Sequence, residues 1–415
     1  MPTDPRDITL ARGLLIAFLL SFGPTVANAF ARFAFALLLP AMRSDLDWTY
    51  SQAGWFNTVN ALGYLLGALV TWGLVAPLGN RVLFCAGMLL TATMIGATGL
   101  VRDFEALMAI RLLTGIGGAA VFICGGALSG TIFLRRPQLA TTTIAIYFAG
   151  GGIGLMLSGV TVPWLLEAQG SGAWPLVWRV MGLASLAMSA AALWAAWGIA
   201  EPGSMAGNAR WTLRPFAAEL VAYALFALGY IGYMTFIIAW MRQNGAGTGL
   251  VMAVWFLLGL ASLLAPLVWR KAAEHWPGGR PLAAVMVVLT AGAVLPLAST
   301  HAAAMLLSAA LFGVAMFSAP SSIGSFIKRA LPSPAWGSAI AVFTVAFAAG
   351  QIAGPVAIGW LADRSGSLQG GLAVSAGLLA LGAVVALVQR DLRTARPGPP
   401  TTQQVDAPGS ARRSS

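Results

Sequence analysis

Residues 249–269 read GLVMAVWFLLGLASLLAPLVW, an apolar run without a charged side chain. The hydrocarbon core of a bilayer is ~30 Å thick and needs ~20 residues of helix to cross it. A helix also satisfies its own backbone N–H and C=O groups, as lipid requires. About twelve such runs fill the chain between Leu14 and Leu387. Charged residues make up 9% of the chain, against roughly 25% in soluble domains. The sequence therefore predicts an all-α membrane protein with twelve transmembrane helices.

The predicted spans are separated by short polar segments, and the basic residues are distributed unequally among these segments. The spans cover residues 11–40, 51–75, 82–101, 105–131, 140–166, 175–199, 216–240, 249–269, 281–299, 302–327, 336–361 and 370–389. Of the 24 Lys and Arg residues, 17 lie in segments on the side of the N-terminus and five on the other side. The positive-inside rule then places both termini in the cytoplasm, including residues 1–10.

The net charge of +11 follows from this topology, so we expect its partner to be anionic lipid headgroups rather than nucleic acid. A signal peptide is the alternative for the N-terminus, because Ala27-Asn28-Ala29 resembles a cleavage site. The apolar run continues to Leu39, which favours a retained helix.

Similar residues recur about 199 positions apart. Trp55-Phe56 recurs as Trp255-Phe256, Arg81 as Arg280, and Gly115 as Gly313. This spacing predicts two six-helix pseudo-repeat bundles, residues 11–200 and 216–390, joined by a cytoplasmic linker at 201–215 and followed by a disordered tail at 391–415. An even number of spans per repeat gives both bundles the same orientation. Transporters built in this way bind their substrate near the midplane, between the halves.

Two motifs carry a resemblance to a known family. Residues 111–119, RLLTGIGGA, resemble the R-x-x-x-G-x-G-x-A motif of the major facilitator superfamily, and residues 30–40, FARFAFALLLP, resemble the first-span signature of its bacterial YbfB/YjiJ-like branch. The resemblance covers about residues 10–390. It implies a secondary transporter of the bacterial inner membrane, working as a monomer by rocking its two bundles. It also implies that Arg111, Gly115 and Arg81 serve packing and gating.

The chain departs from the superfamily pattern at two places. After the second span, Pro77 stands where the superfamily has an acidic residue that latches cations such as Arg81. We therefore expect this latch to be weaker or to be built from other residues. A glycine motif typical of the fifth span of antiporters occurs instead in the eleventh, where it contains Gly354 and Pro355. We place these two residues among the gating or structural positions.

Two arginines lie inside predicted spans. Counting 1.5 Å per residue puts Arg32 ~12 Å and Arg111 ~9 Å below the outer ends of their spans. Ionisable groups inside a membrane are costly and tend to be functional. A guanidinium can hold a carboxylate or a phosphate through two parallel hydrogen bonds. The alternative for both is a structural role, with the guanidinium donating to carbonyls of neighbouring helices. We favour a substrate or gating role for Arg32 and the structural role for Arg111.

None of the thirteen acidic residues lies at the midplane of a predicted span. Glu219 enters one, near its cytoplasmic end, and is the candidate for proton coupling. The alternative is an ordinary acidic residue in the first turn of a helix. Buried cations without buried acids favour an anionic or zwitterionic substrate over a cationic drug.

Uncharged polar residues inside the spans could complete a binding site. The candidates are Asn57, Asn60, Tyr147, Tyr230, Tyr233 and Gln351. For each, the alternative is a hydrogen bond between packed helices. The sequence lacks a nucleotide-binding motif and catalytic clusters at motif spacing, so it predicts no enzyme, cofactor or metal site. We predict a secondary transporter of a small organic anion, and the alternative is efflux of drugs or hydrophobic metabolites.

Overall fold

The computed structural model describes residues 8–201 and 211–392. Most of the predicted linker and nearly all of the predicted tail lie outside these ranges. Every regular element of the described ranges is helical. We refer to residues 8–201 as the N half and to residues 211–392 as the C half.

The N half begins with one long crossing made of α1 (Leu10–Leu20), α2 (Phe22–Pro24), the π-helix η1 (Thr25–Phe33) and α3 (Phe35–Asp45). It continues with the helices α4 (Tyr50–Thr98), α5 (Phe104–Gly130), α6 (Ala140–Gln169) and α7 (Trp174–Trp197), with the short 3₁₀ turns η2 (Pro137–Leu139) and η3 (Ser171–Ala173) before α6 and α7.

The C half contains η4 (Arg214–Phe216), α8 (Ala217–Gln243), α9 (Thr248–His275), α10 (Arg280–Ala298), α11 (Ala302–Met316), α12 (Ser318–Ala330), η5 (Ser333–Ala335), α13 (Trp336–Ser365) and α14 (Leu368–Val388). The helices α11 and α12 follow each other without a loop and form one crossing, Ala302–Ala330.

Twelve crossings result, as the sequence predicts. In the described residues, eleven helical segments are long and apolar enough to span a membrane. One of them, α4, has 49 residues and would be ~73 Å long if straight, more than twice a bilayer core. Its backbone leaves the helical conformation at Gly79, where φ is 80°. Only glycine adopts this conformation readily, so Gly79 divides α4 into the second and third crossings.

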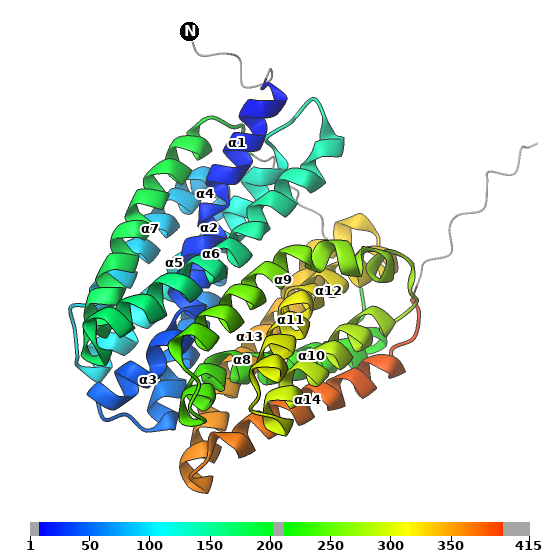
Figure 1. Cartoon of the computed structure of the whole chain (residues 1–415). Helices are drawn as coiled ribbons and strands as arrows, with labels where there is room; N and C mark the ends of the chain where they lie inside the picture. Colours follow the sequence, from blue (N-terminus) through cyan, green and yellow to red (C-terminus); the bar gives the residue numbers. More distant parts are fainter. Residues whose placement is uncertain (1–7, 202–210, 393–415) are drawn as a thin grey trace, which may run out of the picture.

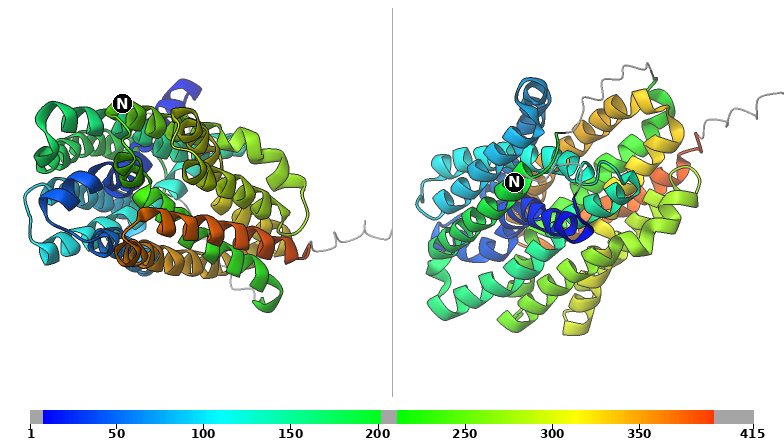
Figure 2. Two further views of the ribbon diagram at one scale, coloured as in Figure 1. Left: turned by 60° about the horizontal axis from the view of Figure 1, so that its bottom comes forward. Right: turned by 90° about the horizontal axis from the view of Figure 1, so that it is seen from above.

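The two halves touch mainly near one end of the molecule. Figure 1 shows the bundles close together around α3, α8 and α13 and spread apart toward the start of α1 and the end of α14. Figure 2 shows the same two bundles side by side from two other directions. We call the end where the bundles lie close together the Asp363 end, after Asp363 near the end of α13. We call the opposite end, where α1 begins and α14 ends, the terminal end. Glycines permit the closest approaches between the halves, for example Gly54 against the carbonyl of Pro355 and Gly359 against that of Tyr50.

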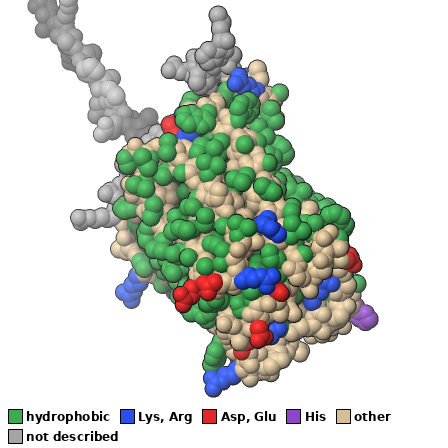
Figure 3. Space-filling view, turned by 90° about the vertical axis from the view of Figure 1, so that its left-hand side faces the viewer, with side chains coloured by type: hydrophobic (Ala, Val, Ile, Leu, Met, Phe, Trp, Pro, Cys, Tyr) green, Lys and Arg blue, Asp and Glu red, His purple; other side chains and the backbone are tan. Residues whose placement is uncertain are grey.

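The surface has the character of a membrane protein. Figure 3 shows hydrophobic side chains over most of one face, with acidic and basic side chains gathered toward its lower part. Large apolar side chains such as Trp72 and Leu267 are largely exposed, as expected for a surface that faces lipid chains.

Two predicted span ends need correction. The helix α9 continues to His275, beyond the predicted end at residue 269. The first crossing extends to Asp45, beyond the predicted end at residue 40, because Pro40 lies inside α3 instead of ending it. The Trp-Phe pairs are not equivalent in burial, since Trp55 is exposed whereas Trp255 is fully buried. Arg81 and Arg280 correspond more closely, because each lies two residues after a glycine with positive φ, Gly79 and Gly278, near the start of a crossing.

Candidate substrate site between the two halves

Arg32 lies on the π-helix η1, facing the C half. In this segment the N–H of Ala34 bonds the carbonyl of Ala29, five residues back, at 2.8 Å. Such wider turns often occur at functional sites. The side chain of Arg32 is buried, with 8% exposure. Its Nη2 donates to Oε1 of Gln351 on α13 at 2.6 Å.

Gln351 connects Arg32 to a third helix, because its Nε2 donates to the hydroxyl of Tyr230 on α8. Three of the residues predicted from sequence, Arg32, Gln351 and Tyr230, therefore meet between the halves. We call them the Arg32 triad.

The positive charge of Arg32 has no acidic partner within the described residues. An ion pair in these residues joins Arg102 to Asp45 at 2.8 Å, on the N-half side of the Asp363 end, and does not involve Arg32. The Nε of Arg32 is buried and has no hydrogen-bond partner in the described part of the chain. A buried charge without an opposite charge is costly. The arrangement is therefore suited to an anion that would take up this donor.

Aromatic rings stack beside the triad. The ring of Tyr230 lies 4.7 Å from that of Phe226 and 5.9 Å from that of Phe347, in near-parallel orientations. Tyr223 continues the stack, 5.0 Å from Phe347. The sequence interpretation missed this wall, although residues 223, 226 and 230 have the spacing of one helical face.

The depth predicted for Arg32 is wrong. Since α3 ends at Asp45, thirteen residues after Arg32, the arginine lies ~20 Å from that end instead of ~12 Å. The positions of its hydrogen-bonded neighbours support this greater depth, because Tyr230 lies in the middle of α8 and Gln351 in the middle of α13. The triad is therefore near the centre of the helical bundle.

Arg111 is fully buried in the N half. Its Nη1 donates to the carbonyl of Ala31 at 2.5 Å, and its Nε donates to that of Phe56 at 3.4 Å. Its guanidinium also lies 4.4 Å from the ring centre of Phe56. Carbonyl and ring contacts of this kind hold helices together. Through Ala31, Arg111 supports the π-helix that carries Arg32.

The two asparagines make different contacts. Nδ2 of Asn57 donates to the hydroxyl of Thr235 on α8 at 2.8 Å, across the halves. Nδ2 of Asn60 donates to the carbonyl of Arg111 at 3.3 Å, within the N half. The Oδ1 of Asn57 is buried and has no partner in the described residues. Asn57 thus lies between the halves, whereas Asn60 joins α4 to α5.

Tyr147 and Tyr233 bond inside their own halves. The hydroxyl of Tyr147 donates to the carbonyl of Val121 at 2.7 Å. That of Tyr233 shares a hydrogen bond of 2.6 Å with Ser308. Both residues are buried, and their contacts are those of the helix-packing alternative.

An acidic residue that the sequence interpretation left out joins the halves at the Asp363 end. The carboxylate of Asp363, at the end of α13, accepts hydrogen bonds from the backbone N–H of Tyr50 at 2.7 Å and of Ser51 at 2.8 Å. It also accepts the hydroxyl of Ser51 at 2.5 Å. Asp363 therefore caps the N-terminus of α4 from the opposite half. Gln243, at the end of α8, adds a bond to the hydroxyl of Tyr50.

The predicted gating residues occupy helix junctions. Gly115 packs against the carbonyl of Asn60, so that α5 and α4 are in close contact. Gly354 packs against α8, and the neighbouring carbonyl of Pro355 faces Gly54 of the N half. The glycine motif of α13 therefore provides close packing on both sides.

Arg81 does not bond an acidic residue near position 77, where the superfamily pattern has one and this chain has Pro77. Its side chain donates to the carbonyls of Ala196 and Ile199, at 3.1 and 2.5 Å. The carboxylate of Glu201 accepts the backbone N–H groups of Asn80 and Arg81 at 3.1 and 2.8 Å. Glu201 thus supplies a negative charge at the start of the third crossing, where Pro77 cannot.

Glu219 is buried in the first turn of α8, with 1% exposure. Its backbone N–H donates to Gln389 at 3.1 Å. Its Oε2 has no hydrogen-bond partner in the described residues. Arg329 on α12 is the positive charge that acts on it. Glu219 lies at the terminal end, eleven residues before Tyr230 on α8, and in the described residues it makes no hydrogen bond with the triad.

A family model described as "Uncharacterised MFS-type transporter YbfB" matches residues 24–387. The chain belongs to this family of major facilitator superfamily transporters. It is therefore a multi-pass membrane transporter and not an enzyme, as the sequence predicts.

The relatives whose names state a substrate have low sequence identity to this chain. The chain is 31% identical over 140 residues to nitrate transporter 2.2 of Chlamydomonas reinhardtii, covering 34% of this chain and 27% of that protein. It is 28% identical over 199 residues to the 3-(3-hydroxy-phenyl)propionate transporter of Escherichia coli, covering 46% of each. A putative tartrate transporter of Agrobacterium vitis is 23% identical over 389 residues, covering 84% of this chain and 86% of that protein. The chain thus spans less than half the length of the first two.

Solved structures show the same fold. The bacterial homologue of the human lysosomal transporter Spinster, in its inward-facing and unoccupied conformation, has a TM-score of 0.67 and 14% identity, covering 91% of this chain and 98% of that chain. The nucleoside transporter NupG has a TM-score of 0.64 and 15% identity, covering 92% and 99%.

Proposed function

We propose that this protein is a secondary active transporter that moves a small organic anion across the bacterial inner membrane by alternating access. The observation that carries the proposal is the Arg32 triad: a buried cation near the middle of the bundle, between the halves, with an unpartnered Nε. The substrate's carboxylate would take this donor, and Gln351 and Tyr230 would orient the guanidinium.

The names of the relatives support a carboxylate. Transporters of hydroxyphenylpropionate and tartrate carry carboxylates, and nitrate is likewise an anion. The stacked rings of Tyr230 and Phe347 would offer an apolar wall to the rest of such a molecule, including an aromatic ring. We therefore place small carboxylates, aromatic ones among them, first among the candidates.

The contacts between the halves support alternating access. The hydrogen bonds that cross between them in the described residues lie at the triad or toward the Asp363 end. With the N-terminus in the cytoplasm, as the basic residues predict, the Asp363 end faces outward and is closed. The conformation would then be inward-open, and transport would require the Asp363 contacts to break.

A binding screen tests the proposed substrate class. Purified protein would be heated with benzoate, hydroxyphenylpropionate, tartrate, phosphate esters and cationic dyes, and the melting temperature recorded. We expect stabilisation by one or more carboxylates, and uptake of the same compounds into proteoliposomes. Stabilisation by the dyes alone would contradict an anionic substrate and favour the efflux alternative.

Glu219 is the residue that we propose for proton coupling. Its carboxylate is buried and its Oε2 has no hydrogen-bond partner in the described residues, so a bound proton would remove an incompletely paired buried charge. We expect Glu219→Gln to keep carboxylate binding but to lose the acceleration of uptake by an imposed pH gradient. The measurement is proteoliposome uptake with and without the gradient. Glu105→Gln, at an exposed helix-start position, is the control. An undiminished gradient effect in Glu219→Gln would assign this residue to structure.

A further inference from the structure

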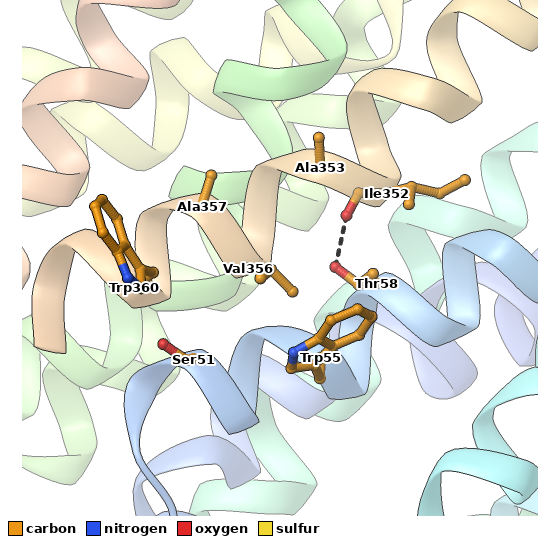
Figure 4. A pocket seen from close by; sticks show the side chains of 8 residues that line it. All are labelled: Ser51, Trp55, Thr58, Ile352, Ala353, Val356, Ala357 and Trp360. Carbon is orange, nitrogen blue, oxygen red and sulfur yellow. Dashed lines mark hydrogen bonds between the residues drawn. The ribbon is translucent and has the colours of Figure 1, made fainter.

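A groove opens on the outer surface of the bundle between α4 and α13. It has a volume of about 460 Å³ and is lined by Ser51, Trp55, Thr58, Ile352, Ala353, Val356, Ala357 and Trp360. Figure 4 shows Trp360 and Ala357 on α13 above Ser51 and Trp55 on α4. The lining includes none of the three triad residues, although Ile352 follows Gln351 directly on α13.

The walls of the groove suit a hydrocarbon chain. Its two polar side chains are already hydrogen-bonded, Thr58 to the carbonyl of Ile352 at 2.7 Å and Ser51 to Asp363 at 2.5 Å. The remaining lining is apolar, and Trp55 and Trp360 are 46% and 52% exposed. Ser51 and Thr58 lie seven positions apart on α4, so the groove extends ~10 Å along this helix from near its N-terminal end. A groove of this kind in lipid loses dispersion contacts unless a chain fills it.

A positive charge lies at the opening of the groove. Arg364 is exposed, and its guanidinium lies 4.9 Å from the ring centre of Trp360. The neighbouring carboxylate of Asp363 is occupied by the N-terminus of α4. Within residues 8–201 and 211–392, Arg364 makes this ring contact and no hydrogen bond or ion pair, so its guanidinium N–H groups can bind a phosphate. Tryptophan beside such a cation is typical of the level of lipid headgroups.

We propose that this groove binds an anionic phospholipid, with one acyl chain between Trp55 and Trp360 and the headgroup phosphate on Arg364. Because α4 and α13 belong to opposite halves, the groove exists only while the Asp363 end is closed. Bound lipid would therefore favour that state. The effect of lipid on the closed state rests on the proposed alternating access. The binding of lipid to the groove does not.

Native mass spectrometry of the purified full chain in detergent tests the site without any transport measurement. Dioleoyl phosphatidylglycerol, dioleoyl phosphatidylcholine and glycerol phosphate would be titrated separately. We expect the wild type to bind phosphatidylglycerol about fivefold more tightly than phosphatidylcholine, as one arginine near the headgroups provides. Arg364→Gln should equalise the two lipids, and Ala357→Phe, which fills the groove, should remove both adducts.

Matched variants separate this site from general lipid contact. Arg179→Gln and Ala187→Phe change exposed residues of α7 and should bind both lipids as the wild type does. Melting in lipid-free detergent establishes that each variant is folded. The proposal is overturned if Arg364→Gln keeps the preference, if Ala357→Phe binds phosphatidylglycerol normally, or if glycerol phosphate binds as tightly as the lipid.

Discussion

Arg32→Gln is expected to reduce carboxylate uptake at low substrate concentration by about 30- to 4,000-fold. Removing one partner of a buried, hydrogen-bonded charge pair costs about 2–5 kcal/mol, and each 1.4 kcal/mol is tenfold in affinity. Glutamine keeps a polar side chain near Gln351 and Tyr230 but lacks the charge and the Nε donor. The measurement is initial uptake into proteoliposomes over a range of substrate concentrations.

Arg32→Lys separates charge from geometry. Lysine retains the charge but cannot form two parallel bonds to a carboxylate, so we expect an intermediate loss that appears mainly in KM. The melting temperature without substrate shows whether each variant is folded. If a stable Arg32→Gln protein transports carboxylates at the wild-type rate, Arg32 is structural and the proposed site is incorrect.

Asp363→Ala is expected to open the Asp363 end. The substitution removes the bonds from Tyr50 and Ser51 and the cap that they give α4. Loss of a cap costs about 1–2 kcal/mol, which changes the ratio of two states by about 5- to 30-fold. Spin labels at Glu105→Cys and Gln369→Cys, with Cys85 and Cys124 replaced by alanine, would report this as a second, longer distance in pulsed EPR.

Asp103→Ala is the matched control for this prediction. Asp103 caps α5 by accepting the N–H of Ala106 at 2.9 Å, but both residues belong to the N half. The control should therefore weaken a helix N-terminus without lengthening the distance between the labels at 105 and 369. Equal distance distributions in Asp363→Ala and the wild type would show that Asp363 does not hold the halves together.

Most of the fold could be predicted because apolar length is a local property. The predicted spans match the helices to within a few residues, apart from the first crossing, which continues to Asp45, and α9, which continues to His275. Two features depend on backbone detail that composition does not encode. These are the π-helix at Thr25–Phe33 and the continuation of α4 through Pro77 to the break at Gly79.

The candidate site could be predicted only in part. Arg32, Tyr230 and Gln351 stand out as polar residues inside apolar spans, yet Tyr147 and Tyr233 show the same pattern and bond within their own halves. The sequence gives no rotation of one helix relative to another, and this rotation decides which residues meet. Asp363 was missed for a different reason. An acidic residue at a helix end resembles any solvated loop residue until its partner on α4 is known.

Glu201 has a consequence for the history of the family. It lies more than 120 positions after Pro77, yet it bonds the same helix start that an acidic residue near position 77 would serve. An acidic residue near position 77 and Glu201 would place the same negative charge at this helix start, so we expect natural selection to preserve only one of them. Among aligned homologues, those with an acid restored at position 77 should tolerate loss of Glu201, and those with proline there should retain it. Such compensation would make the acidic residue near position 77 an unreliable guide to membership in this branch.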